Sequence, residues 1–306
     1  MKFSGAWKKF FTDPWAIAAL TIVIFFILTA LTFDIYAAWC QKNQLLPTYM
    51  ISSTDSSFLP PCPAHILGTD YQGRDVFLRT LAGCSSALKT GVISGLIAII
   101  IGVAAGVCAG YFGGRTDDIT VWFYSTFAAM PTLLFILAFA LLFSKDFLSP
   151  VLASGFRQIA AIVHVEPGML GIYLAIGLSG WVTLCRVIRG ETMKLKRAGF
   201  VAAAKIAGVS DIKIIFRHIL PNVFHLIIIY FTTLFASAVM LEVIVSYLGM
   251  GVQNAPSWGI MIADGQSRLW SGVWWEITSA SGALLILVLA LNILGDAMRD
   301  AFDPRR

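Results

Sequence analysis

Charged residues are scarce in this sequence of 306 residues. Asp, Glu, Lys and Arg make up 13% of it, whereas hydrophobic residues make up 58% and the mean hydropathy is +0.80. Soluble domains carry about 25% charged and about 45–50% apolar residues. A chain with so little charge cannot cover a soluble surface, so the composition excludes an ordinary soluble domain and indicates an integral membrane protein.

Sequence motifs of several enzyme classes are also missing. No Gly-Lys dipeptide occurs, so the chain lacks the G-x-x-x-x-G-K-[ST] loop that cradles nucleotide phosphates. Neither H-E-x-x-H nor G-x-S-x-G is present, and the histidines form no helical ligand pair. We therefore expect no catalytic residue, no metal site and no cofactor in this chain, and an intramembrane enzyme is disfavoured.

Cysteine is rare as well, with five residues in the chain. Cys40 and Cys62 fall on the side of the membrane that the charge pattern predicts to be outside. An oxidising periplasm there would permit a disulfide between them. Spacing alone gives no geometry, so the sequence leaves both the bonded and the free state open.

Long hydrophobic runs are what the sequence has in abundance. Each of six runs has about 20 residues, enough to cross a hydrocarbon core of about 30 Å. Because the runs are continuous rather than alternating, they predict helices rather than a β-barrel. They cover residues 15–33, about 90–111, about 119–143, about 168–188, about 222–248 and about 277–298. The predicted fold class is an all-α polytopic membrane protein with six transmembrane helices.

The distribution of Lys and Arg predicts the orientation. With six spans, fifteen of the 22 Lys and Arg residues fall on the side that also holds both termini. Cytoplasmic loops carry the excess of positive charge in membrane proteins. We therefore expect cytoplasmic N and C termini, and the sequence pI of about 9.0 reflects this asymmetry rather than nucleic-acid binding.

The segment GFVAAAKIAGVSDIKIIFRHILP (199–221) is a polar interruption between the fourth and fifth runs. Its alanine-rich start, 198–206, suits a helix, which Gly208 can end by adopting a positive φ. Pro221 suits the first turn of the fifth span. The pattern predicts two short helices at the cytoplasmic surface, at about 198–218. An amphipathic connector lying on lipid headgroups is the plain alternative.

This segment resembles the cytoplasmic coupling motif of ABC importer permeases, which usually reads E-A-A, three residues, Gly, about nine residues, then a hydrophobic residue, any residue and Pro. The matching positions are Ala202, Ala203, Ala204, Gly208, Leu220 and Pro221. Other similar segments are HILGTDYQGRDVFLRTLAG (65–83), GYFGGRTDD (110–118), PTLLF (131–135), SYLGMGVQNAPSWGIMIADG (246–265) and NILGDAMRDAFDPR (292–305). Together they resemble the second, C-type permease of the dipeptide/oligopeptide/nickel group. Ala202 departs from the pattern, because the family usually has glutamate there.

The resemblance implies a type I ABC importer permease fold in a bacterial inner membrane, with several partners. A second, homologous permease would complete the path, two ATPase subunits would bind ATP and Mg²⁺, and a solute-binding protein would deliver the cargo. The coupling segment would seat in a groove of an ATPase. The chain then divides into residues 1–89, with the first span and an outer loop, and 90–306, the core permease domain.

Peptides are the cargo that the resemblance favours. Nickel or another metal chelate and glutathione-like peptides are the alternatives. An ion-coupled secondary transporter is the rival of a different class, but it needs a coupling-ion site at the midplane and often has internal repeats. The sequence shows no convincing example of either.

Four residues are candidates for an outer site or gate. Asp70, Arg74 and Asp75 lie in the loop before the second span and can form an ion-pair network, or they simply fix the loop, since exposed pairs contribute only about 0–1 kcal/mol. Trp258 is either a gate residue facing the solute-binding protein or one of the tryptophans that concentrate at membrane interfaces.

Two features inside the spans complete the candidates. Glu242 is an ionisable residue within the fifth span, which suggests function by default, although a hydrogen-bonded structural role is equally compatible. Gly102, Gly106 and Gly110 recur on one helix face and predict close helix packing.

Residues at about 144–167 are predicted to form an interfacial hairpin. A seventh span there would reverse the orientation of the basic loop that follows, against the distribution of Lys and Arg.

Overall fold

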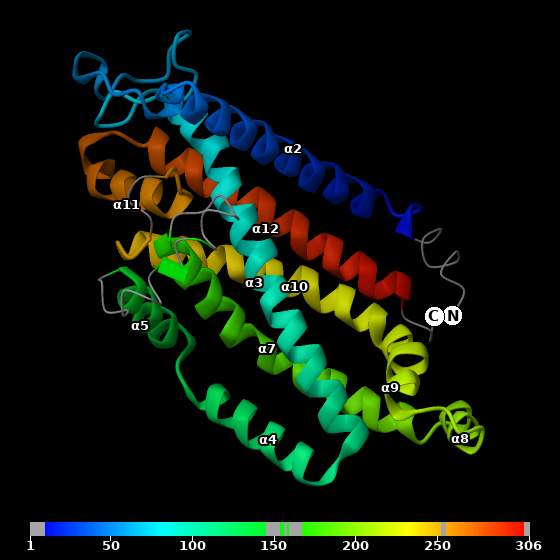
Figure 1. Ribbon diagram of the computed structural model, residues 1–306. Helices are drawn as coiled ribbons and strands as arrows, with labels where there is room; N and C mark the ends of the chain where they lie inside the picture. The colour runs from blue at the N-terminus through cyan, green and yellow to red at the C-terminus, as the bar shows by residue number, and fades with distance from the viewer. Residues whose placement is uncertain (1–9, 145–153, 156–157, 159–166, 252–254, 303–306) are drawn as a thin grey trace.

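The computed structural model describes residues 10–144, 154–155, 158, 167–251 and 255–302, which form helices joined by loops (Figure 1). The α-helices are α2 (Pro14–Lys42), α3 (Val76–Phe112), α4 (Gly114–Ala129), α5 (Thr132–Ser144), α7 (Pro167–Lys196), α8 (Gly199–Ile206), α9 (Asp211–Ile214), α10 (Leu220–Tyr247), α11 (Trp258–Arg268) and α12 (Trp275–Phe302). Shorter helical turns are η1 (Thr48–Met50), η2 (Thr54–Ser56), the π-helical turn η3 (Ile215–Ile219) and η4 (Leu269–Ser271).

Five helices are long and apolar enough to cross a membrane: α2, α3, α7, the continuous helix over residues 211–247, and α12. The third predicted span, 119–143, needs correction, because α4 and α5 meet there at an angle of 88°. The break falls at Met130, whose backbone is extended (φ −82°, ψ 132°). Pro131 follows it, and a proline ring disfavours helical backbone in the residue before it. If the bent pair counts as one span, the total is six.

Helix α3 is longer than its predicted span, 90–111. It begins at Val76 because the Asp75 carboxylate accepts a hydrogen bond from the amide of Leu78 (2.9 Å) and caps the helix. Its 37 residues extend about 55 Å at 1.5 Å per residue, well beyond a hydrocarbon core of about 30 Å. The division predicted at residues 89 and 90 therefore falls inside a continuous helix, part of which lies outside the hydrocarbon.

Helices α3 and α7 pack closely along the face that carries Gly102, Gly106 and Gly110. A methyl group added at these glycines would lie 3.0, 2.8 and 2.6 Å from backbone carbonyl oxygens of α7. These distances are too short for a side chain at Gly106 and Gly110 and very tight at Gly102, so the glycines permit the two backbones to approach. The predicted packing face therefore lies against a helix of the same chain.

The two ends of the bundle carry different segments (Figure 1). The start of α2, the end of α12, and α8 and α9 lie at one end, here the α8 end. The loop over residues 43–75 and α11 lie at the other, here the α11 end. This arrangement puts the described ends of the chain at the same end of the bundle as the predicted coupling segment. Two further predictions concern the outer side. Cys40 and Cys62 are both free thiols, so the structure contains no disulfide between them. The predicted hairpin at 144–167 falls almost entirely outside the described residues.

Candidate coupling helix and outer polar network

Helix α8 stands away from the body of the bundle (Figure 1). Val201 is its one buried residue, through which it packs on the cluster formed by the ends of α3, α7 and α9. Ala202 and Ala203 are exposed, and Ile206 exposes 89% of its surface. Single apolar residues on a surface are ordinary, but here small side chains and an isolated isoleucine share one short projecting helix. The helix therefore presents a surface of small and apolar side chains at the α8 end, where another molecule can contact it.

A left-handed turn ends α8, as predicted. Gly208 has a φ of +73°, its amide donates to the carbonyl of Lys205 (3.0 Å), and the amide of Val209 donates to the carbonyl of Ala204 (3.1 Å). This pair of bonds is the Schellman arrangement, which satisfies the last carbonyls of a helix. A methyl group added at Gly208 would meet nothing within 4 Å. The position therefore favours glycine for its backbone conformation and not for lack of space.

Tyr111, near the end of α3, joins the coupling segment to the bundle. Its hydroxyl donates to the carboxylate of Asp211, in the first turn of α9, at 2.5 Å. The ammonium groups of Lys196 and Lys205 lie 5.8 and 5.1 Å from the centre of its ring, within the range of cation–π attraction. One buried ring thus contacts the end of α7, α8 and the start of α9.

The fifth span begins earlier than Pro221 predicts. Residues 211–247 form one continuous helix, which widens into the π-helical turn η3 just before Leu220. A proline inside an α-helix lacks the amide hydrogen and its ring clashes with a preceding carbonyl, so a wider turn accommodates it. The side-chain amide of Asn222 donates to the carbonyl of His218 (2.6 Å), which helps to satisfy the altered backbone. The predicted second short helix is therefore the base of the fifth span.

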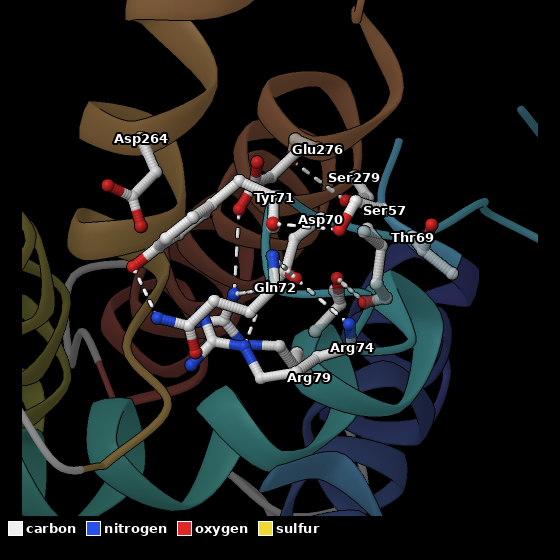
Figure 2. A network of polar contacts seen from close by, with 12 residues as sticks. Ser57, Thr69, Asp70, Tyr71, Gln72, Arg74, Arg79, Asp264, Glu276 and Ser279 are labelled. Carbon is white, nitrogen blue, oxygen red and sulfur yellow. Dashed lines mark hydrogen bonds and ion pairs between the residues drawn. The ribbon is translucent and has the colours of Figure 1, made fainter. Parts of the chain in front are cut away.

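At the α11 end, Asp70 is the centre of a buried polar network (Figure 2). Its Oδ1 accepts hydrogen bonds from the amides of Gln72 (2.8 Å) and Arg74 (2.9 Å). Its Oδ2 accepts from the Arg74 Nε at 2.6 Å and from the Arg79 guanidinium. The structure therefore joins Asp70 and Arg74 in an ion pair, and it adds Arg79 from the first turns of α3.

The network continues into α12 through Glu276. Its carboxylate is fully buried, with one oxygen 3.5 Å from Arg79 and the other 3.5 Å from Arg268 of α11. Neither oxygen has a hydrogen-bond partner among the described residues, so the two arginines are the polar groups that face this carboxylate there. The Arg268 guanidinium also lies 4.2 Å from the centre of the Tyr71 ring. The network thus connects the 43–75 loop, α3, α11 and α12.

Asp75 does not belong to this network, so the ion-pair alternative holds for Asp70 and Arg74, whereas Asp75 fixes the loop at the start of α3. Its Oδ1 caps α3, and its Oδ2 lies 2.8 Å from the Nδ1 of His65. The turn between Asp70 and Asp75 explains the separation. Gly73 has a φ of +72°, and a methyl group added there would lie 1.9 Å from the carbonyl oxygen of Ser53. The chain reverses tightly at this glycine, so the two aspartates point to different partners.

Trp258 and Glu242 both lie inside the bundle. The indole of Trp258 is buried and donates from Nε1 to the carbonyl of Thr80 (2.8 Å), which fixes the start of α11 on α3. The Glu242 carboxylate is buried and accepts hydrogen bonds from the hydroxyls of Ser246 (2.7 Å) and Ser257 (2.9 Å). Ser257 is also the N-cap of α11. Both side chains therefore hold α11 against neighbouring helices.

Sequence reasoning missed four residues that connect elements: Tyr111, Arg79, Arg268 and Glu276. Glu276 directly precedes the predicted sixth span, 277–298, so it was not counted among the intramembrane ionisable residues. Arg79 precedes the predicted second span, about 90–111, so the sequence places it in the outer loop. The pair of Arg79 and Glu276 becomes visible only in the tertiary structure, because the two residues lie far apart in the sequence.

Comparison with known proteins gives consistent matches over nearly the whole chain. Residues 71–306 match the family model described as "Binding-protein-dependent transport system inner membrane component". The dipeptide transport system permease protein DppC of Bacillus subtilis is 32% identical over 302 residues, which cover 98% of this chain and 85% of the relative. The oligopeptide transport system permease protein OppC of Escherichia coli (strain K12) is 30% identical, with 99% and 91% covered. The glutathione transport system permease protein GsiD of Escherichia coli O1:K1 is 28% identical, with 98% and 89% covered.

Proposed function

The chain belongs to the family of binding-protein-dependent transport system inner membrane components, and we propose that it is the permease subunit of an ATP-driven peptide importer. In this role it forms the path for the peptide together with a second, homologous permease. A solute-binding protein delivers the peptide on the outer side of the membrane. Two ATP-binding-cassette subunits drive transport from the cytoplasmic side.

The observation that carries this proposal is the geometry of α8. The helix projects from the bundle, exposes small side chains, and ends in the glycine turn at Gly208. Tyr111 and the continuous helix over residues 211–247 connect it to the membrane-spanning part. A partner that moves α8 therefore moves α3 and the fifth span with it. We propose that this partner is an ATPase subunit and that Ala202, Ala203, Ala204, Gly208, Leu220 and Pro221 form or support the coupling surface.

We place ATP and Mg²⁺ binding, and the hydrolysis of ATP, in the partner subunits. The sequence offers no phosphate-binding loop of the P-loop type, so the motor is a separate polypeptide. This chain supplies the membrane path and the surface on which the motor acts. It contributes no catalytic residue to the reaction.

Peptides are the proposed cargo. The names of three relatives state transport of dipeptides, oligopeptides and glutathione, which are all peptide-class compounds. Metal chelates such as those of nickel are the alternative cargo. Glutathione-like peptides are a second alternative, and the name of one relative states glutathione transport.

Uptake by the complete complex tests the proposal. Proteoliposomes should contain this chain, the second permease and both ATPase subunits, with ATP inside and with binding protein and a labelled dipeptide outside. We expect uptake that depends on ATP and persists when an uncoupler removes the ion gradients. Competition with glutathione and with a nickel chelate identifies the cargo class. Uptake that needs an ion gradient and no ATP would instead establish a secondary transporter.

The orientation has its own test. Single cysteines placed in 45–60 or 255–268 of a chain whose own cysteines are replaced should react with an impermeant reagent added to intact cells. Cysteines placed in 192–215 should react only after the cells are opened. External labelling of the latter segment contradicts both the cytoplasmic termini and the coupling role.

A further inference from the structure

Helix α7 differs from the other spans in what it exposes. It is the most enclosed of the five candidate spans, because 67% of an apolar stretch of 18 residues in it is buried within the chain. Ser179, Thr183, Arg186 and Gly190 follow one another at helical spacing, and from Thr183 onwards they form an exposed stripe. By contrast, α2 exposes Phe25, Leu28 and Leu31. A lipid-facing surface is apolar, and ionisable residues inside spans face a bundle interior or a water-filled cavity, so this stripe faces a polar space.

A pocket opens on this stripe, inside the bend between α4 and α5. Its volume is about 180 Å³, which leaves room for several water molecules or one small polar group. Ser179, Thr183 and Arg186 line one side, and Thr132 lies across from them at the start of α5. Phe127 belongs to the apolar wall and packs edge-on against two aromatic rings, those of Phe135 and Trp181. The proline break therefore produces a site with a polar side and an apolar side.

Two arginines lie at or near this pocket, and they differ in whether an acidic residue compensates their charge. One helical turn away, Arg189 is paired with Asp117 of α4, with its Nη2 2.6 Å from the Asp117 Oδ2. Arg186 has no such acid: among the residues that the structure describes, no carboxylate lies within ion-pair distance of it. Its guanidinium lies 4.8 Å from the centre of the Tyr124 ring and remains exposed to the pocket. The pocket therefore presents one uncompensated positive charge beside the hydroxyl group of Thr183.

We propose that this pocket, the Arg186 pocket, binds the carboxylate of the cargo during its passage through the membrane. An arginine guanidinium is planar and donates two parallel hydrogen bonds to a carboxylate, and the neighbouring hydroxyl can donate another. Every unmodified peptide ends in a carboxylate, so the site recognises peptides without regard to side chains. Its exposure keeps binding weak enough for release, which a translocation path requires. The inference rests on the proposed function, since it assigns a subsite on the proposed path.

The test compares two cargoes that differ only at the C-terminus. Uptake of a dipeptide and of its C-terminal amide is measured with the complete complex, for the wild type and for Arg186→Gln. We expect the variant to lose about tenfold in uptake of the free carboxylate, while its uptake of the amide stays within about twofold. The preference of the binding protein enters the ratio between the two cargoes equally for the wild type and the variant, so it cancels when the two ratios are compared. Arg186→Lys should retain part of the preference, because it keeps the charge and loses the paired hydrogen bonds.

Lys194→Gln is the matched control. It removes a positive charge from the same helix, but Lys194 is exposed and paired with Glu191 in the last turns of α7. This control should leave the ratio between the two cargoes unchanged. The amount of assembled complex is measured for each variant, so that a loss of assembly is not read as a loss of recognition.

Two outcomes overturn the Arg186 pocket. An unchanged ratio in Arg186→Gln, whether uptake falls or not, means that Arg186 does not bind the cargo carboxylate. A loss that is equal for both cargoes and disappears in vesicles without anionic lipid assigns Arg186 to lipid phosphate. Both outcomes leave ATP-dependent uptake by the wild type intact, so the proposed function survives them. Absence of that wild-type uptake overturns the proposed function itself.

Discussion

The two ends of the bundle differ in how deeply their polar residues are buried and in how many segments these residues connect. At the α11 end, Asp70, Arg79 and Glu276 are nearly inaccessible and connect four segments of the chain. At the α8 end, α8 has one buried residue, Val201, and few further contacts, which include Lys205 on the Tyr111 ring and Phe200 beside His218. A buried ion-pair network fixes relative positions, since each charge depends on its partners. A projecting helix with few contacts can be moved without dismantling the core.

This contrast suits a transporter in which force enters at one end. A partner that displaces α8 acts on α3 through Tyr111 and on the fifth span through the continuous helix. The same two spans are fixed at the α11 end, where Arg79 anchors α3 and Glu242 ties the fifth span to α11. Motion at the α8 end is therefore expected to reach the far end as a rigid-body change rather than as local unfolding. Four predictions test the contrast.

The largest effect is expected from Asp70→Ala. The substitution leaves Arg79 buried without its strongest partner, and breaking a buried ion pair costs about 3–5 kcal/mol. The thermal midpoint of the purified protein in detergent should fall markedly, and the yield should drop. Asp55→Ala is the control, because Asp55 is an exposed acid of the same loop. Equal midpoints for the two variants would show that the network does not fix the α11 end.

Gly208→Leu should abolish uptake and co-purification of the ATPase subunits, with insertion into the membrane intact. The left-handed backbone at Gly208 costs a bulky residue about 1 kcal/mol or more, and its side chain would project from the docking surface. Gly208→Asn should retain more activity, because asparagine tolerates a positive φ. Normal transport by the leucine variant would show that α8 is an amphipathic connector and not a coupling helix.

Tyr111→Phe tests whether the α8 end is connected through one hydrogen bond. The variant keeps the ring between Lys196 and Lys205 and loses only the bond to Asp211. A hydrogen bond to a charged group contributes about 1.5 kcal/mol or more, so peptide uptake should fall about tenfold. ATPase subunits should still co-purify, because α8 itself is unchanged. Unaltered uptake would mean that the fifth span alone transmits the motion.

The smallest effect is expected from Ala202→Glu, which introduces the residue that the resemblance leads one to expect. Ala202 is exposed on α8, so the glutamate meets no steric obstacle within the chain. Since this chain lacks that charge, a contact made by glutamate is not essential here. Uptake should change by less than tenfold, the equivalent of about 1.4 kcal/mol. A larger loss would show that the docking groove is matched to alanine.

Local signals explain which parts of the structure the sequence predicted. The alanine-rich start of α8 and the turn at Gly208 depend on neighbouring residues, and both lie where the pattern placed them. The bend at Pro131 was missed because apolar residues continue on both sides of it, so hydropathy reads one span. Residues that meet only in the folded chain were also missed. Arg79 and Glu276 come from opposite ends of the sequence, and a glycine turn directs Asp75 away from Asp70.

Helix α4 has a consequence for the life of the protein in a cell. None of its 16 residues is buried within the chain, and Ile119, Trp122 and Phe123 are largely exposed. Its surroundings therefore come from other molecules, and a copy made without them keeps an uncovered aromatic segment. Cells remove such incompletely packed chains through chaperones and proteases. Because α4 forms part of a candidate span, lipid covers part of its surface, and prompt insertion into the membrane is therefore expected to limit how much of the protein is lost.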